Sequence, residues 1–336
     1  MISRVIVIFV LILFSPLYAI QDDDPKKQKI QISKGLFVVR GNPSFLLGIS
    51  YFDALSAPRD ILEADLSFLR VRRFNTIRIW ASWYDEFQPK ASSVIRKNGT
   101  LNPDGVERLK RVLNATKSKN LLVILVFSRD ALPGITFNNY KSGIRKVASI
   151  LKPYRFLLFD VQNETNHCGV TDVNCTGHLT LSQVSAIRTA VKQVDSQRLV
   201  TASRNQDGFI PGKDDYVTFR IIGNVDFIAT HRPSRTKDGN WANLTDDEAQ
   251  SIRAVVGPKI PILFDEPNRC GNNMECVSAS ESNYFVTAAK NAKKSGAAGW
   301  IFHTKAGFHL SRRPLSSQLV PIEKSAIDRI AQAIGM

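Results

Sequence analysis

Two polar segments that follow apolar runs carry the acids with the clearest chemical potential in this sequence. The first is "FLLFDVQNETNH", residues 156–167, where a run suited to a buried strand ends in amides around Glu164. The second is "PILFDEPNR", residues 261–269, where the apolar run is followed by Asp265 and Glu266. Burying polar groups without a purpose is costly. Both glutamates are therefore candidates for a function.

A pair of carboxyl groups in one site can cleave a glycosidic bond. One carboxylic acid protonates the leaving oxygen, and the other carboxylate attacks the anomeric carbon when the two groups are about 5–5.5 Å apart. Their surroundings must separate the two pKa values. Arg78, in the run "NTIRIW", can keep the nucleophile ionised by its charge and hydrogen bonds. Either glutamate taken alone also fits an ordinary loop residue.

The elements that must bring these residues together alternate along the chain. Apolar runs suited to strands are separated by amphipathic helical patterns, and they cover residues 45–51, 75–80, 120–127, 156–161, 198–203, 225–230, 260–265 and 298–303. Alternating strands and helices indicate a parallel sheet, and near-continuous apolar strands indicate burial on both faces. Eight such units predict an α/β protein with a (β/α)8 TIM barrel as a single domain over residues 29–336. Residues 29–40 predict a short β-hairpin that closes the bottom of the barrel.

A doubly wound open sheet is the alternative fold. Its first strand is usually followed by a glycine-rich phosphate turn, and "GISYFDALSA", residues 48–57, is not such a turn. In a barrel, active sites lie at the carboxyl ends of the strands. Besides the two glutamates, these ends supply His231 on the sixth strand and Trp300 and His303 on the eighth. Aromatic rings can stack on sugars, and we expect Trp300 to do so first, followed by Trp80, Trp83 and Tyr51.

The amino terminus has the pattern of an export signal. Residues 1–19 contain Arg4, an apolar run over 5–14 and a small residue at Ala19. Residues 20–28 then read as a solvated linker, and we expect a secreted or cell-envelope protein. An uncleaved membrane anchor is the alternative for this segment. After it, no stretch of the sequence is long and apolar enough to span a bilayer.

The composition limits the partners. The chain has 45 Lys and Arg against 30 Asp and Glu, a net charge of +15, in scattered positions. Nucleic-acid binding would favour a clustered basic patch, which is absent from the sequence. The expected partner is a carbohydrate, with an anionic glycan as one option, and we expect a monomer.

Four cysteines, Cys168, Cys175, Cys270 and Cys276, can form disulfides in an exported protein. Pairing Cys168 with Cys175 and Cys270 with Cys276 is the simplest of three connectivities. Bridges there would stiffen the loops that follow the two glutamates. A zinc site made by His167, Cys168, Cys175 and His178 is the alternative for the first pair.

These motifs, in this order, resemble the clan A glycoside hydrolases, and most closely the cellulase and mannanase group called family 5. The resemblance covers the whole mature chain. It implies retaining hydrolysis of β-glycosidic bonds without a cofactor, with Glu164 as acid/base and Glu266 as nucleophile. It also implies roles for residues that bind substrate: Asn163 at the sugar 2-hydroxyl, Arg78 beside the nucleophile, Trp300 as a subsite floor, and His231 as the histidine of strand six.

The sequence also departs from that family. Members often carry a tyrosine soon after the strand-six histidine and a histidine at the end of strand three. This chain has Arg232-Pro233 and Ser128-Arg129 there instead. Arg129 and Arg232 favour recognition of a uronic acid or sulfate. A glycan-binding barrel without catalysis and a metal-dependent barrel hydrolase are the alternative functions, although five dispersed histidines do not favour metal chemistry.

Overall fold

The structure is a computed structural model that describes residues 29–82, 93–128, 134–165, 178–205, 220, 223–231, 240–270 and 276–336. The expected signal and linker over residues 1–28, together with Trp83, Arg129, Cys168, Cys175 and Arg232, lie outside the described residues. Of the helices in the described part of the chain, none has the length and apolar character needed to cross a membrane.

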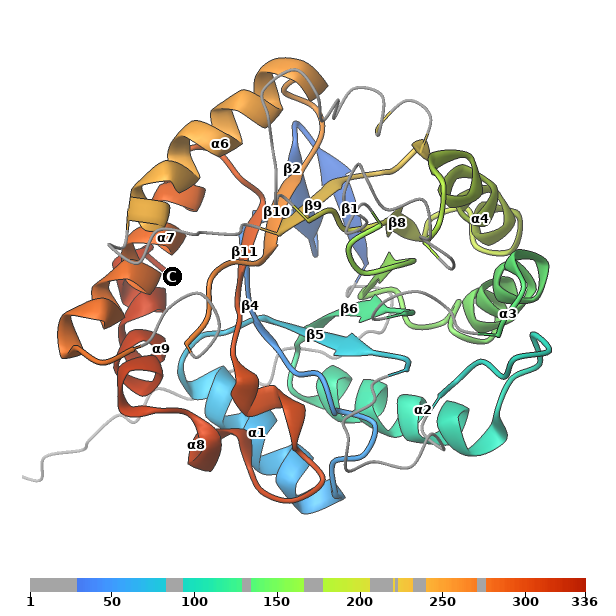
Figure 1. Ribbon diagram of the computed structural model, residues 1–336, viewed down its shortest axis with the longest axis horizontal. Coiled ribbons are helices and arrows are strands. Elements are labelled where there is room, and N and C mark those ends of the chain that lie inside the picture. Colours follow the sequence, from blue (N-terminus) through green and yellow to red (C-terminus); the bar gives the residue numbers. More distant parts are fainter. Residues whose placement is uncertain are drawn as a thin grey trace, which may run out of the picture.

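Eight parallel strands form the centre of the molecule (Figure 1). They are β4 (Leu46–Ser50), β5 (Thr76–Trp80), β6 (Leu122–Val126), β7 (Leu157–Asp160), β8 (Leu199–Thr201), β9 (Ile228–His231), β10 (Ile262–Glu266) and β11 (Gly299–Phe302). Their order is β8-β7-β6-β5-β4-β11-β10-β9, and a parallel bridge between Arg204 and Thr230 joins β8 to β9. Each strand lies within or overlaps its predicted apolar run, and the predicted barrel is confirmed.

The helices surround the strands as an outer layer (Figure 1). They are α1 (Arg59–Val71), α2 (Pro103–Ser118), α3 (Phe137–Ile150), α4 (Leu181–Val194), α6 (Asn240–Val256), α7 (Ser282–Lys294), α8 (Leu315–Gln318) and α9 (Pro321–Ala333). Each long helix forms because an apolar stripe faces the barrel; in α1 the stripe is Leu62, Leu66 and Leu69. Proline at the first position starts α2 and α9.

An antiparallel sheet precedes the barrel. Its strands are β1 (Ile30–Ser33), β2 (Leu36–Val39) and β3 (Asn42–Ser44), one more than the predicted hairpin. Ile30 donates its backbone N–H to the carbonyl of Arg155, and the Phe37 ring packs edge-on against Phe227 at 5.3 Å. Because Arg155 and Phe227 precede β7 and β9, the sheet covers the amino-terminal end of the barrel, as expected, and leaves the opposite end for the site.

Candidate active site

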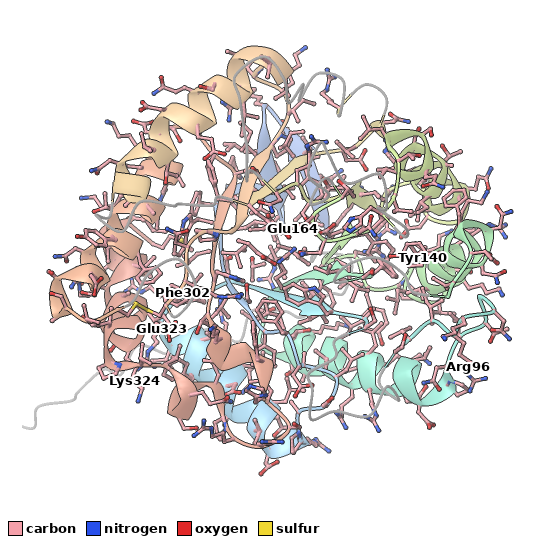
Figure 2. The ribbon with its side chains drawn as sticks, viewed as in Figure 1. Arg96, Tyr140, Glu164, Phe302, Glu323 and Lys324 are labelled. Carbon is pink, nitrogen blue, oxygen red and sulfur yellow. A yellow bond between two sulfur atoms is a disulfide. The ribbon has the colours of Figure 1, made fainter. Side chains whose placement is uncertain are left out.

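Glu164 and Glu266 meet at the carboxyl ends of the strands. Glu266 is the last residue of β10, and Glu164 lies four residues after the end of β7, near the centre of the ring (Figure 2). One carboxylate oxygen of each, together with a ring nitrogen of His231, lie within 4.8 Å of one another. A retaining pair of carboxyl groups needs a spacing of about 5–5.5 Å. Two acids 102 positions apart in the chain thus have the spacing for one bond-breaking event.

The amides around Glu164 fix the turn that presents it. Gln162 accepts a hydrogen bond from the Leu179 N–H at 2.7 Å, and the Asn163 N–H donates to the Ser128 carbonyl at 2.9 Å. Glu164 itself has a φ of 50°, in the left-handed region that residues other than glycine rarely adopt. Such strain costs roughly 1–3 kcal/mol and persists where surrounding contacts hold it. The polar ending of the apolar run therefore aims a carboxylate into the mouth.

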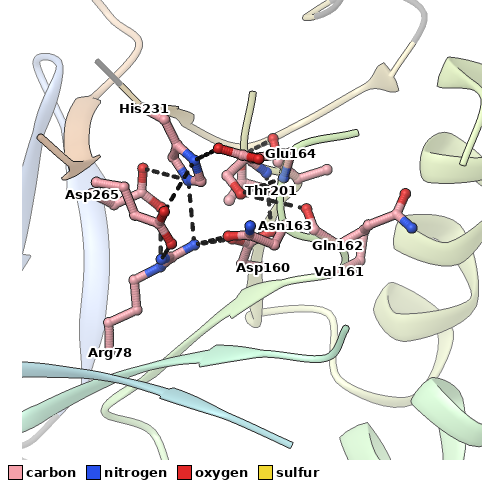
Figure 3. Close-up of polar contacts among 12 residues, drawn as sticks. Arg78, Asp160, Val161, Gln162, Asn163, Glu164, Thr201, His231 and Asp265 are labelled. Atoms are coloured by element: carbon pink, nitrogen blue, oxygen red, sulfur yellow. Dashed lines mark hydrogen bonds and ion pairs between the residues drawn. The ribbon is translucent and has the colours of Figure 1, made fainter. Parts of the chain in front are cut away.

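Arg78 lies at the centre of the polar contacts of the site (Figure 3). Its side chain is fully buried in the barrel, and it forms ion pairs with Asp160 at 3.1 Å, with Asp265 at 3.2 Å and with Glu266. It also donates a 2.7 Å hydrogen bond to the Asn163 side-chain oxygen. Burial opposes the charge, but the three carboxylates together hold the pKa of Arg78 above its ordinary value. A planar guanidinium can serve all these partners at once, whereas a lysine ammonium could not.

Glu266 is held as a carboxylate. Burial would raise the pKa of this side chain, but the cations His231 and Arg78 outweigh burial and lower the pKa of Glu266 to about 2. Its side chain is 12% exposed, so it remains open to the mouth. A carboxylate that stays ionised in a low-dielectric site is what a nucleophile requires.

His231 lies between the two glutamates. Its Nδ1 is 2.8 Å from Glu164 Oε1 and 3.5 Å from Glu266 Oε2, and its Nε2 is 3.5 Å from Asp265 Oδ1. Burial would lower its pKa, but Glu266 and Asp265 outweigh burial and raise the pKa of His231 well above 6.5. His231 is therefore a second cation of the site, and it contacts both acids.

Two further buried acids, Asp160 and Asp265, belong to the same cluster. Asp160 pairs with Arg78 from β7, and burial raises the pKa of Asp160 to about 6 despite that cation. Asp265 and Glu266 are consecutive, yet both reach Arg78. The pairing of β10 with β9 shifts register between Phe264 and Glu266, and such a bulge lets two neighbours face the same side. The sequence drew attention to Asp265 without pairing it with Arg78, and it gave Asp160 no role, although an acid inside an apolar run was a usable signal.

His303 and Arg269 complete the wall beside the nucleophile. His303 follows β11 and lies 3.8 Å from Glu266, measured between Nε2 and Oε2. Its Nδ1 is 3.2 Å from the Ser50 hydroxyl, and its Nε2 is 2.6 Å from Arg269 Nη1. The Arg269 guanidinium also lies 5.1 Å above the Phe308 ring. The sequence placed His303 at a strand end but predicted no partner for it.

Trp300 does not line the site, so its predicted role as a stacking floor is wrong. Side chains alternate between the two faces of a strand. His303 and Ile301 face the interior of the barrel, and the Cδ1 of Ile301 lies over Gly48, 2.5 Å from where a Cβ on that residue would be. Trp300 therefore shares the outer face with Phe302, which packs at 4.8 Å on Phe285 of α7. Trp300 is fully buried there.

Tyr51 and Trp80 lie in different surroundings. Tyr51 is fully buried and donates a 2.8 Å hydrogen bond to Asp65 of α1, so it is not open to a sugar. Trp80 faces the interior, where its ring stacks on Phe52 at 3.9 Å and lies 4.5 Å from the Arg78 guanidinium carbon. With 1% of its surface exposed, Trp80 supports Arg78 rather than offering an open face.

Cys270 and Cys276 form a disulfide, as expected for the second pair. It closes the loop that begins four residues after Glu266. Glu164, His231 and Glu266 each present one atom suited to a metal. Those atoms are already engaged by one another and by Arg78, and we assign none of them as a metal ligand.

Comparisons with known proteins bear on the family and the fold. A family model described as "Cellulase (glycosyl hydrolase family 5)" matches residues 40–303. The fold is similar to an endo-1,4-β-mannanase from Rhizomucor miehei, with 14% identity, a TM-score of 0.65, and coverage of 91% of this chain and 99% of that one. It is also similar to a β-mannanase from the blue mussel Mytilus edulis, with 14% identity, a TM-score of 0.62, and coverage of 91% of this chain and 97% of that one. An endo-1,4-β-D-mannanase from Thermotoga petrophila RKU-1 has 16% identity, a TM-score of 0.58, and coverage of 77% of this chain and 88% of that one. No curated protein has a matching sequence.

Proposed function

The chain belongs to glycosyl hydrolase family 5, a family of glycosidases, and on this premise we propose that it is a secreted enzyme cleaving β-glycosidic bonds by double displacement. Glu266 acts as the nucleophile and Glu164 as the acid/base. The observation that carries this proposal is the convergence of the two carboxyl groups within 4.8 Å at the open end of the barrel. Export is supported by the signal pattern over residues 1–19 and by the disulfide Cys270–Cys276.

In the first step, the Glu266 carboxylate attacks the anomeric carbon while Glu164 gives its proton to the glycosidic oxygen. The bond between that carbon and that oxygen breaks, and the sugar becomes an ester of Glu266. Glu164 enters this step protonated, with its Oε1 2.8 Å from Nδ1 of His231. In the second step, Glu164 takes a proton from water, the hydroxyl adds to the anomeric carbon, and Glu266 leaves as a carboxylate.

Substrate binding is proposed for Asn163, Arg78 and His231, which surround the two acids. Asn163 is held by Arg78 at 2.7 Å, which orients its amide toward the sugar 2-hydroxyl. The substrate is a β-linked polysaccharide or oligosaccharide. A β-mannan is a first choice because the three solved structures named above are described as mannanases. Acidic polymers belong in the same trial because the net charge is +15.

Hydrolysis of a panel of aryl β-glycosides and of neutral and acidic polysaccharides tests the proposal. Glu164→Gln and Glu266→Gln are each expected to lose nearly all activity, on the order of 10⁴-fold or more, because each role is essential. Glu63→Gln, an exposed glutamate of α1 paired with Arg59, is the matched control and retains activity.

The product's stereochemistry separates this mechanism from its alternatives. The first product must keep the β configuration, which proton NMR detects before mutarotation. An α product would contradict a double displacement. Binding of a glycan without any hydrolysis would favour a barrel that only binds carbohydrate.

A further inference from the structure

The nucleophile has a neighbour whose charge state is set by a hydrogen bond. His303 Nε2 lies 3.8 Å from Glu266 Oε2 and 2.6 Å from Arg269 Nη1. A guanidinium can only donate hydrogen bonds. Nε2 must therefore accept, which leaves Nδ1 as the protonated nitrogen. That N–H points to the Ser50 hydroxyl at 3.2 Å. Both nitrogens are thus assigned by their partners, and the imidazole is neutral.

We propose that Arg269 is a positioning residue that keeps His303 neutral beside the nucleophile, so that Glu266 stays reactive in acidic solution. The inference rests on the role proposed above for Glu266. A proton on Nε2 would break the contact with Arg269, and the new N–H would then point at Glu266. An imidazolium bound to that carboxylate would hold the electron pair that must attack the sugar.

The other charges around His303 support this assignment. Glu266 on β10 favours a charged imidazole, whereas Arg269, His231 on β9 and Arg78 on β5 oppose it. Burial opposes it most, since only 5% of His303 is exposed, and together these effects lower the pKa of His303 to about 3. The site already places two cations, Arg78 and His231, against Glu266. A third would favour the ion pair over the attack.

Arg269 is itself well placed for the role. It lies three residues after Glu266 and directly before Cys270, whose disulfide closes the following loop. Phe308 lies beneath the guanidinium at 5.1 Å, and the carboxylate of Glu323, on α9, interacts with Arg269 across space. The guanidinium therefore meets the histidine from a supported position, and the two distances at Nε2 keep Arg269 Nη1 within 6.4 Å of Glu266 Oε2.

The decisive experiment compares pH profiles of kcat/KM for the wild type, Arg269→Gln, His303→Gln and the double variant. In Arg269→Gln, Nε2 can take a proton and donate it to Glu266, so the pKa of His303 rises from about 3 toward its ordinary value although burial still opposes the charge, and the acidic limb of the profile moves to higher pH. We expect a loss of about tenfold per pH unit below that limb, and a loss of at most about threefold at pH 8. The double variant has no group to titrate there, so the shift disappears.

The controls separate this role from a structural one. Arg269→Lys keeps a cation that donates and is expected to show a smaller shift. Arg188→Gln removes an arginine from α4 that pairs with Asp226, and its profile should match the wild type. An equal loss of activity at every pH, or a shift that persists in the double variant, overturns the proposal. The proposal is also overturned if Arg269→Gln raises KM only for acidic substrates and leaves the acidic limb of the pH profile in place, because Arg269 would then bind substrate.

A second measurement does not depend on activity. Nitrogen chemical shifts of the five histidines, assigned by comparison with His303→Gln, report the protonation of His303 directly. The wild type should show a neutral ring from pH 5 to 8, and His303 in Arg269→Gln should take up its proton at a higher pH than in the wild type. A His303 that titrates alike in both proteins refutes the inference. A protein that hydrolyses no glycan would refute the proposed function and leave this result standing.

Discussion

Replacing Glu266 by glutamine should destabilise the fold, although many active-site residues weaken the proteins that carry them. The reason is the low pKa of Glu266, about 2 against an ordinary 4.5. Each pKa unit is worth about 1.4 kcal/mol, so the ionised carboxylate contributes about 3 kcal/mol of folding free energy at pH 7. Glutamine cannot form the ion pair with Arg78 and forfeits that contribution.

The pH dependence follows from the direction of the shift. A depressed pKa gives stability that is fully present above the unfolded value, near 4.5, and is lost as the pH falls toward 2. The difference between wild type and Glu266→Gln should therefore be constant from pH 5 to 8 and shrink between pH 4 and 3. With an unfolding entropy of about 2 cal/mol/K per residue over roughly 300 residues, 3 kcal/mol lowers Tm by about 5 °C.

Scanning calorimetry and urea unfolding at pH 7, 5, 4 and 3 measure both quantities. Glu63→Gln is again the matched control, because its partner Arg59 is 82% exposed and such surface pairs contribute at most about 1 kcal/mol. A Glu266→Gln protein as stable as the wild type at pH 7 would show that Arg78 and His231 do not hold this carboxylate as argued.

Three more predictions test the surroundings of the pair. Asp160→Asn removes a carboxyl whose pKa burial raises from 3.8 to about 6; a raised carboxyl pKa costs stability as the pH rises from the unfolded to the folded value, so the stability of this variant relative to wild type should increase between pH 4 and 6 in urea unfolding and stay constant above pH 7. Trp300→Phe should lower Tm with an unchanged KM, because Trp300 packs in the outer layer; a raised KM would place its ring in the site after all. Replacing Cys270 and Cys276 together by alanine should cost about 2 kcal/mol for the small loop they close, whereas unchanged thermal unfolding would contradict a stabilising bridge.

The fold could be predicted because its signal repeats. Each strand is buried on both faces and reads as an apolar run, and each following helix carries a stripe of apolar residues. Eight repeats of that pattern leave few alternatives. The same reasoning located Glu164, Glu266, Arg78 and His231, because a barrel brings every strand's carboxyl end to one rim. Topology alone supplied that proximity.

The sequence-based predictions were wrong or incomplete where a shift of one residue along a strand decides which way a side chain points. Trp300 lies within β11 and His303 directly follows the strand, but an odd number of positions separates them, so one faces α7 and the other the nucleophile. The bulge after Phe264 turns Asp265 and Glu266 to the same side, which no alternating pattern predicts. Barrel topology is tolerant of one-residue uncertainties, whereas the direction of a side chain is not.

The arrangement of charges also explains why one histidine contacts both acids. Before the attack the negative charge lies on Glu266; once the ester forms, Glu266 is neutral and Glu164, having given up its proton, carries the charge. The reaction proposed here moves one negative charge between groups that lie within 4.8 Å. His231 Nδ1 is 3.5 Å from the first and 2.8 Å from the second, so a fixed cation faces the charge at both stages. Such a preorganised group stabilises the transition state without rearranging. Arg78 therefore stabilises the charge of Glu266 alone, whereas His231 stabilises the charge on whichever of the two glutamates carries it.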